Sequence, residues 1–278
     1  MLRGCGHLQG EPKLLPIFYI NLASRTDRRE HVEKQLEALG LEGTRIDAVT
    51  PADLAGVDYG QLSASELGCS RSHQKIWQLL VDQDIPAALI LEDDVLLSQH
   101  LATVLADPRL LDGVDAIQFE TRGTSALVGR PVPTPVEGVT RNRLMSSSLG
   151  SAAYIMTKHL AARLLAHPER DNLPLDTFIF GRPGSVFYEA KIFQAVPALA
   201  IQLDQIAGGR DGAGRSDLNE RRGTFSLRDP RSSESRLKRG LRHWGHHQRV
   251  VTTFGPMGEL WGARQHRLPV ADDLRRLM

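Results

Sequence analysis

The stretch AALILEDDV, residues Ala87–Val95, gives the clearest indication of the fold. Its first half is apolar and follows Pro86, which is typical of a strand that is buried on both faces of a parallel sheet. Three carboxylates, Glu92, Asp93 and Asp94, come directly after it. An ionised carboxylate is costly to bury unless it is paired or binds a metal, so we expect the triplet at the carboxyl edge of the sheet. Ligands bind at that edge in open α/β folds.

Two interpretations of this acidic triplet stay open. Three crowded negative charges repel one another, and a divalent cation turns that repulsion into binding. This interpretation predicts a metal site that receives a diphosphate. The alternative is a solvated acidic loop.

Composition sets wide limits on the rest of the chain. The 278 residues are 41% hydrophobic and 24% charged, which is enough for one large domain with its own core. A formal net charge of +1 creates no global field, and we expect no nucleic-acid partner. Two cysteines, Cys5 and Cys69, provide no disulfide framework and fit a reducing cytosol. We find neither a signal peptide nor a membrane span, so the expected location is cytoplasmic.

The first ordered segment has the pattern of a strand, a loop and a helix. Residues 1–13 are expected to form a flexible leader, and Ile17–Leu22 has the aromatic and β-branched content of a strand. Val32, Leu36 and Leu39 then share one helical face up to Gly40. This is a Rossmann-like opening. Four polar residues stand where the loop meets the helix, and they either grip a nucleotide or form a solvated face: Asn21, Arg25, Arg28 and Arg29.

A second helix is indicated by a capping box, in which Ser63 and Glu66 satisfy each other's backbone donors. Its apolar face runs to about Val81. The small, polar run GCSRSH, residues 68–73, interrupts that face, and its glycine costs about 1 kcal/mol in a helix relative to alanine. We therefore expect something to approach the helix closely there. On these grounds alone, His73 is expected to be a buried structural histidine bonded to a carbonyl.

Later segments alternate between strand and helix patterns. Residues 123–138 lack periodicity, which predicts a mobile loop or a hairpin over the site. Asp176 stands among apolar residues and is either a helix cap or a functional group. The other predicted elements are strands at 45–49, 115–120, 152–156 and 192–201, the last ending at Gln202, and helices at 100–106 and 158–166.

The end of the chain, residues 219–278, is expected to be a basic C-terminal extension. Arginines dominate Arg221–Arg249, which also contains Trp244. Such a segment can rest on an anionic membrane, where each cation contributes roughly 1 kcal/mol. The alternative is a solvated or partly disordered tail.

In this order the motifs resemble glycosyltransferase family 25, the family of bacterial lipooligosaccharide galactosyltransferases and collagen galactosyltransferases. The resemblance extends from Leu14 to Leu218. Leu218 stands where the family usually has isoleucine, and the tail beyond it aligns with nothing in the family. The matching motifs are INL at 20–22 with Arg28 and Arg29, Leu62–His73 with Glu66, Gly68, Cys69 and Ser72, LEDDV at 91–95, Gly150 with AYI at 153–155, LPLD at 173–176, Gln202, and SDL at 216–218.

The resemblance implies an α/β fold of GT-A type, a Rossmann-like nucleotide-sugar-binding domain over residues 14–218 with a mostly parallel central sheet. It also implies a divalent cofactor, Mn²⁺ or Mg²⁺, and inversion at the anomeric carbon. The expected enzyme is a hexosyltransferase, a β-galactosyltransferase that moves galactose from UDP-galactose onto an oligosaccharide or lipid-linked acceptor such as lipooligosaccharide (LPS) core. We expect it to work at the inner face of the membrane, as a peripheral protein.

The resemblance also assigns roles to individual residues. Asp94 is expected to bind the metal directly, with Glu92 or Asp93 shared between the metal and the ribose. A single displacement also needs a general base, for which Asp176 is the candidate and Glu120 the reserve; a metal-shell or sugar-binding role for Asp176 stays open. The donor-binding residues carried over are Asn21, Arg28, Arg29, Ser72, His73, Glu92, Asp93, Gly150, Tyr154 and Gln202.

Two other classes of protein compete with this reading. A Mg²⁺-dependent phosphoryl or nucleotidyl transferase also places acids after a strand, but the sequence has no P-loop pattern. A catalytically silent sugar-binding module would have a broken acidic triplet, and here the triplet is complete.

Overall fold

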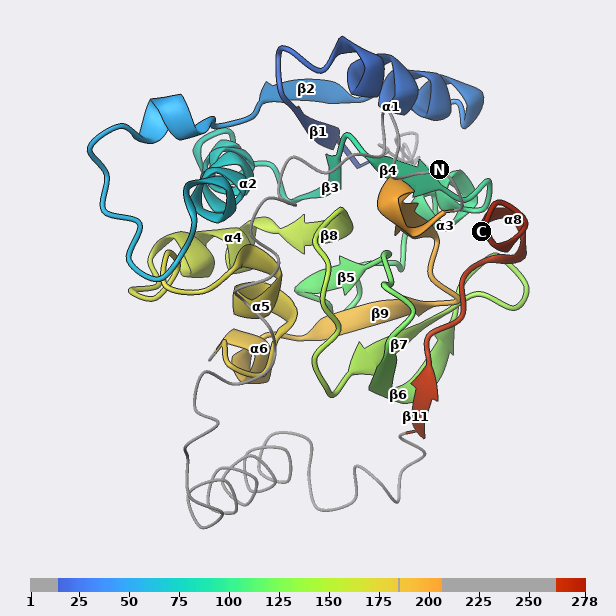
Figure 1. Cartoon of the computed structure of the whole chain (residues 1–278). Coiled ribbons are helices and arrows are strands. Elements are labelled where there is room, and N and C mark those ends of the chain that lie inside the picture. Colours follow the sequence, from blue (N-terminus) through green and yellow to red (C-terminus); the bar gives the residue numbers. More distant parts are fainter. Residues whose placement is uncertain (1–14, 185, 207–263) are drawn as a thin grey trace, which may run out of the picture.

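A mixed sheet forms the centre of the molecule (Figure 1). The computed structural model describes residues 15–184, 186–206 and 264–278. Within these residues the sheet has nine strands in the order β11-β6-β7-β9-β5-β8-β3-β1-β2, and β4 pairs with β10 in a separate two-stranded ribbon. The strands are β1 Ile17–Asn21, β2 Thr44–Asp47, β3 Ala87–Glu92, β4 Val95–Leu97, β5 Ala116–Gln118, β6 Ser125–Pro133, β7 Thr140–Leu144, β8 Ala153–Thr157, β9 Ile192–Val196, β10 Ala200–Gln202 and β11 Arg264–Arg267.

Most of the described strands in the large sheet share one direction. β1, β2, β3, β5, β6 and β9 run one way, while β7, β8 and β11 run the other way. The predicted α/β fold with a mostly parallel central sheet is confirmed in this sense, and the GT-A type stays a prediction. The antiparallel strand β8 interrupts the parallel set between β3 and β5, and the Rossmann-like part is the parallel run β2-β1-β3.

Helices cover both faces of the sheet. Ile17 and Tyr19 of β1 pack in one apolar cluster with α1, whereas Phe18 and Ile20 pack in another with α2. Because alternate side chains both meet an apolar layer, β1 and β3 are apolar without alternation. The helices are α1 Thr26–Ala38, α2 Ala64–Asp82, α3 Leu101–Leu105, α4 Lys158–Leu165, α5 Leu175–Phe180, α6 Val186–Glu189 and α8 Asp272–Arg275, with 3₁₀ turns η1 Pro51–Leu54 and η2 Leu203–Gln205.

The N-terminal half of α2 has the predicted geometry. The Ser63 backbone N–H donates to Glu66 Oε2 at 2.8 Å and the Glu66 N–H donates to Ser63 Oγ at 3.2 Å, so the capping box is confirmed. A Cβ on Gly68 would lie 2.7 Å from the carbonyl oxygen of Val49. The predicted close approach is therefore the segment between β2 and η1, which rests on the helix at its glycine.

Two sequence predictions need correction. Residues 123–138 are mostly the strand β6, which forms a hairpin with β7, so the mobile-loop reading is wrong and the hairpin reading holds. The single strand predicted at 192–201 is two strands, β9 in the large sheet and β10 beside β4. Pro197 lies between them and has no N–H to continue the ladder.

The described end of the chain returns to the domain. β11 pairs with β6 at the edge of the sheet, and Leu268, Val270 and Leu274 are buried. Residues 264–278 therefore belong to the same unit as residues 15–206, although we predicted an extension from 219. The predicted leader 1–13, the motif at 216–218 and the segment Arg221–Arg249 lie outside the described residues. No helix in the part of the chain that is described combines the length and apolarity needed to cross a membrane.

Candidate active site

The predicted acidic triplet lies at the carboxyl edge of the sheet, where β1 and β3 both end. Asn21 is the last residue of β1 and Glu92 the last of the parallel neighbour β3. Asp93 and Asp94 follow in the turn to β4 and are each 6% exposed. The reading as a solvated acidic loop is therefore wrong, and burial at this edge requires partners for the charges.

Asp93 has partners on both oxygens. Asn21 Nδ2 donates to its Oδ2 at 2.7 Å, and Arg28 donates to its Oδ1 at 3.1 Å. Arg45 in turn donates to Asn21 Oδ1 at 2.9 Å. Asp93 thus ties the turn after β3 to β1 and α1, and its oxygens are already used by the protein.

Asp94 is held less completely. Its Oδ2 lies 3.5 Å from Arg28, and its buried Oδ1 has no hydrogen-bond partner among the described residues. Burial and, as a smaller contribution, the neighbouring Glu92 charge raise the pKa of Asp94 to about 7. The Leu203 N–H donates to the Asp94 carbonyl at 2.8 Å and fixes the backbone here. A buried carboxyl with a free oxygen and a raised pKa is suited to a cation.

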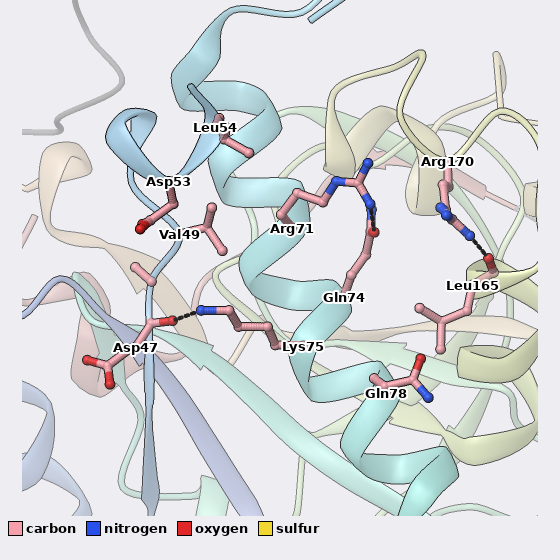
Figure 2. Close-up of a pocket in the computed structure, with 11 residues that line it drawn as sticks. Asp47, Val49, Asp53, Leu54, Arg71, Gln74, Lys75, Gln78, Leu165 and Arg170 are labelled. Atoms are coloured by element: carbon pink, nitrogen blue, oxygen red, sulfur yellow. Dashed lines mark hydrogen bonds between the residues drawn. The ribbon is translucent and has the colours of Figure 1, made fainter. Parts of the chain in front are cut away.

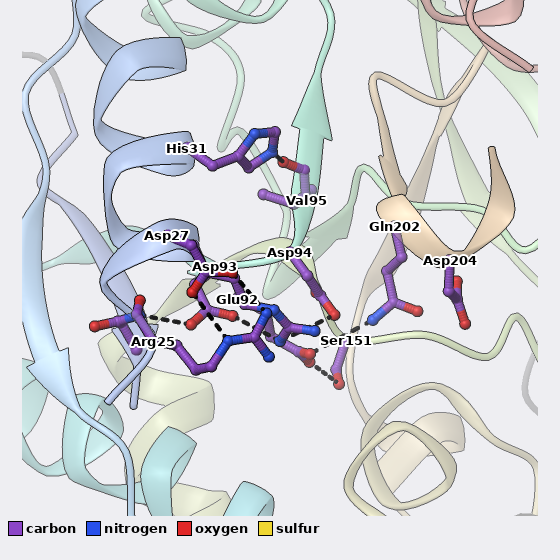
Figure 3. A network of polar contacts seen from close by, with 12 residues as sticks. Arg25, Asp27, His31, Glu92, Asp93, Asp94, Val95, Ser151, Gln202 and Asp204 are labelled. Atoms are coloured by element: carbon purple, nitrogen blue, oxygen red, sulfur yellow. Dashed lines mark hydrogen bonds and ion pairs between the residues drawn. The ribbon is translucent and has the colours of Figure 1, made fainter. Parts of the chain in front are cut away.

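Glu92 faces the same space from the end of β3 (Figure 3). Ser151 Oγ donates to Glu92 Oε1 at 2.9 Å, and Gln202 Nε2 lies 3.5 Å from Oε2. Burial raises the pKa of Glu92, but contacts with His73 and Ser151 outweigh this and hold the pKa below its usual value. An ionised Glu92 beside the free oxygen of Asp94 provides the oxygen donors that Mn²⁺ or Mg²⁺ prefers, so these residues fit the expected metal.

Gln202 connects the triplet to a cation that the sequence reasoning missed. Arg122 donates to Gln202 Oε1 and, at 3.3 Å, to Asp204 Oδ2. The only sequence signal for Arg122 was its place just after the strand that carries Glu120. The antiparallel pairing of β10 with β4 positions Gln202 at the site, because Gln202 lies opposite Val95 in that pairing.

The two candidate bases lie on either side of Gly150. Glu120 is 0% exposed, accepts a hydrogen bond from the Ala152 N–H at 2.7 Å, and has its pKa raised to about 8 by burial and by the Glu92 charge. Asp176 is only partly buried. It accepts hydrogen bonds from the N–H groups of Gly150 and Thr177 at 3.2 and 2.6 Å, and burial raises its pKa.

Gly150 is where the two carboxyls approach one backbone. Its φ is +118°, and a Cβ there would lie 2.6 Å from the Glu120 carboxyl. Asp176 is in the first turn of α5, whose N-cap is Pro174, so it is not the cap. Its side chain accepts hydrogen bonds from two backbone N–H groups, and its functional role stays a prediction.

Three predicted donor-binding residues have other contacts. Arg29 has a 51% exposed side chain and pairs with Glu33 at 3.0 Å, away from the triplet. Side chains of neighbouring helical residues point about 100° apart. Of the pair Arg28 and Arg29, it is therefore Arg28 that faces the site. Ser72 donates to the Gly68 carbonyl at 2.7 Å and accepts from the Val49 N–H at 2.8 Å, and so holds the cavity wall.

Tyr154, the third, lies beneath the site. It is fully buried, and its hydroxyl contacts His73 Nδ1 at 2.9 Å and accepts from Trp77 Nε1 at 3.1 Å. His73 is buried as predicted, but its partner is this hydroxyl and not a carbonyl. Its Nε2 lies 3.6 Å from Glu92 Oε1.

The acidic triplet and its neighbours line a cavity of about 150 Å³. Its lining combines the triplet and Arg28 with the α2 side chains and Gln202: Ile20, Leu22, Arg28, Ala48, Val49, Pro51, Ser65, Cys69, Ser72, His73, Glu92, Asp93, Asp94 and Gln202.

A larger hollow of about 700 Å³ lies on the other side of the 48–49 segment (Figure 2). Its cations are engaged by the protein: Lys75 donates to the Asp47 carbonyl at 2.9 Å, Arg71 pairs with Asp171 at 2.8 Å, and Arg170 donates to the Leu165 carbonyl. None of the predicted site residues lines it, and we place the active site in the smaller cavity.

Comparison with known proteins gives consistent matches. The family described as Glycosyltransferase family 25 (LPS biosynthesis protein) matches residues 14–179. The lipooligosaccharide biosynthesis protein lic2B of Haemophilus influenzae is 24% identical over 208 residues, covering 68% of this chain and 76% of that protein. The lacto-N-neotetraose biosynthesis glycosyltransferase LgtB of Neisseria gonorrhoeae is 27% identical over 185 residues, covering 59% and 66%. A solved glycosyltransferase involved in glycosylation of the major capsid of PBCV-1 is 11% identical with a TM-score of 0.39, covering 68% of this chain and 91% of that one.

Proposed function

The chain belongs to glycosyltransferase family 25, and we propose that it is a metal-dependent, inverting enzyme that moves galactose from UDP-galactose onto a saccharide acceptor. Glycosyl transfer follows from the family. The metal, the donor sugar and the acceptor are the proposal, and the observation that carries it is the buried Oδ1 of Asp94 beside Glu92, which has no hydrogen-bond partner in the described part of the chain.

Asp94 and Glu92 would hold the cation. When bound there, Mn²⁺ or Mg²⁺ supplies Lewis-acid stabilisation of the negative charge that develops on the leaving diphosphate. Asp93 keeps the turn in place through Asn21 and Arg28, so that Asp94 is presented in one orientation. The cavity is smaller than the several hundred Å³ usual for a whole ligand of this size, so we assign to it only the metal-binding end of the donor.

Asp176 is the proposed general base. An acceptor hydroxyl must reach the base, and Asp176 is partly exposed whereas Glu120 is fully buried. The proton of the hydroxyl would pass to a carboxyl oxygen of Asp176. Its raised pKa makes this carboxylate a better proton acceptor than an ordinary one, while the N–H groups of Gly150 and Thr177 keep it oriented.

The assignments of the donor and the acceptor rest on the similarity of this chain to known proteins. The names of lic2B and LgtB place those proteins in lipooligosaccharide and lacto-N-neotetraose biosynthesis, and we extend this to a saccharide acceptor such as lipooligosaccharide core, reached at the inner face of a membrane. Galactose rests on the family resemblance. UDP-glucose and a UDP-N-acetylhexosamine are the nearest other donors.

A donor screen tests the proposal. The full chain is incubated with UDP-, GDP- and CMP-sugars in the presence of Mn²⁺, and both thermal stabilisation and sugar release are measured. We expect UDP-galactose to give the largest effect in both. Equal effects from all UDP-hexoses would contradict the galactose assignment, stabilisation without any release would favour a silent binding module, and release of UMP in place of UDP would favour a nucleotidyl-transfer type of cleavage.

A further inference from the structure

Cys69, His73 and Glu92 form a second group of possible metal ligands on the α2 side of the cavity. One ligand atom from each residue lies within 4.8 Å of the other two. Cys69 and His73 are four residues apart on α2, so their side chains share one helix face, and Glu92 reaches them from the end of β3. All three line the same cavity.

The buried imidazole of His73 points to a ligand. His73 is 1% exposed, yet its Nε2 has no hydrogen-bond partner among the described residues and faces Glu92 at 3.6 Å. The other ring nitrogen is anchored by the Tyr154 hydroxyl, which Trp77 holds in place from behind. An imidazole with one nitrogen fixed by a second residue and the other directed at further ligand atoms is the usual arrangement of a metal-binding histidine.

We propose that Cys69 Sγ, His73 Nε2 and a Glu92 oxygen bind a Zn²⁺ ion at a site distinct from the Asp94 site. A thiolate and an imidazole select Zn²⁺ over the harder Mn²⁺ and Mg²⁺, which prefer oxygen. Three protein ligands leave the fourth tetrahedral position to water or a substrate oxygen. As the sulfur–zinc bond forms, the Cys69 thiol releases its proton to solvent, and the Nδ1–H of His73 donates to the Tyr154 oxygen.

Glu92 belongs to both metal sites, so the two should compete. Zn²⁺ that recruits Glu92 withdraws it from the cation held with Asp94, and excess Zn²⁺ should inhibit sugar transfer even when Mn²⁺ is present. This consequence rests on the proposed function, but zinc binding itself does not. A binding measurement without donor therefore separates failure of the zinc site from failure of the transferase assignment.

Co²⁺ absorption spectroscopy on the full chain tests the site, because Co²⁺ reports thiolate ligation and tetrahedral geometry directly. We expect a thiolate charge-transfer band in the near ultraviolet and visible bands of tetrahedral Co²⁺, both removed by one equivalent of Zn²⁺. Cys69→Ser should lose the thiolate band, whereas Cys5→Ser, the matched control, should keep it. Asp94→Asn should also keep the band, since Asp94 serves the other cation.

Removal of the Tyr154 hydroxyl, which orients His73, should weaken Zn²⁺ binding less than removal of a ligand. Tyr154→Phe keeps the ring and removes the oxygen behind His73, and we expect Zn²⁺ to bind roughly 10 to 100 times more weakly. Cys69→Ser should weaken binding more than this. A wild-type Co²⁺ spectrum without a thiolate band would overturn the proposal whatever the variants do, and so would unchanged Zn²⁺ affinity in Cys69→Ser.

Discussion

At the scale of single residues, the site depends on unequal environments around four neighbouring carboxyls. Asp93 is satisfied by Asn21 and Arg28, and Glu92 has its pKa held below the usual value. Burial raises the pKa of Asp94 to about 7 and that of Glu120 to about 8. In the proposed mechanism, these different environments suit Asp93 to brace the turn, Glu92 to stay ionised, Asp94 to bind the cation and Glu120 to stay a neutral acid.

Metal affinity should depend on pH through Asp94. Protons compete with the cation for a carboxyl whose pKa is about 7, so the Mn²⁺ affinity should fall by up to about tenfold for each pH unit below that value. Mn²⁺ binding measured by electron paramagnetic resonance between about pH 6 and pH 8 checks this. An affinity that is constant over this range would count against Asp94 as a ligand.

Glu120 should make the fold less stable as pH rises. Its ordinary pKa of 4.5 applies to the unfolded chain and about 8 to the folded one, so between these values only the folded state keeps the proton. The free energy of unfolding should therefore decrease from about pH 4.5 to about pH 8. Glu120→Gln, which is always neutral, should escape this loss.

Urea unfolding of the two proteins at several pH values measures the effect. The stability advantage of Glu120→Gln over the wild type should grow as pH rises through the window and level off above about pH 8. A difference that does not change with pH would show that Glu120 is not a buried neutral acid.

At the scale of elements, local patterns predicted what local forces determine. The capping box and the close approach at Gly68 were both read correctly on α2, because they depend on residues near in sequence or on one missing side chain. The sequence left β6 open between a mobile loop and a hairpin, since its proline-containing, partly exposed sequence is held by pairing with β7 and β11. Pairing of this kind leaves no periodic pattern of apolar residues in the sequence of the strand.

The site shows the same division. The triplet and Asp176 followed from motifs, whereas Arg122 and the role of Tyr154 depend on which strands become neighbours. Gln202 meets Glu92 only because β10 pairs with β4, and Tyr154 meets His73 only because β8 pairs with β3 beneath α2. The spacing of these residues along the chain does not predict the contacts between them.

Gly68→Ala should destabilise the protein, although alanine favours a helix by about 1 kcal/mol. The new Cβ would lie 2.7 Å from the Val49 carbonyl oxygen, which Ser72 and the backbone hold near the helix. Overpacking of this kind costs roughly 1–3 kcal/mol and should outweigh the helix preference. Gln78→Ala, at an exposed position of α2, is the control in a urea titration. A Gly68→Ala protein as stable as the wild type would disprove the contact.

At the scale of the whole molecule, the fold dictates how the basic segment Arg221–Arg249 must be tested. Truncation before that segment would also remove β11, which pairs with β6, and α8, together with the buried Leu268, Val270 and Leu274. Loss of membrane binding would then be confused with loss of folding. Replacing the segment's arginines by glutamine leaves these elements in the chain.

The basic segment is expected to give reversible binding to anionic lipid that weakens with salt. We predict that the wild-type chain sediments with anionic vesicles at low salt and is released at high salt, because screening shortens the range of the attraction. The glutamine variant should remain in the supernatant in both cases. Equal, salt-independent binding by the two proteins would refute a membrane role for the segment and leave the transferase assignment intact.

In the proposed mechanism, sugar transfer depends on a cation held by Asp94. The most direct test measures release of UDP from UDP-galactose by the wild type, by Asp94→Asn and by the exposed control Asp82→Asn, with Mn²⁺ and with excess EDTA. We predict activity only with Mn²⁺, a loss of at least about 100-fold in Asp94→Asn, since charge stabilisation by a metal is worth several kcal/mol, and no change in Asp82→Asn. Full turnover in EDTA, or an Asp94→Asn enzyme as active as the wild type, would contradict the claim.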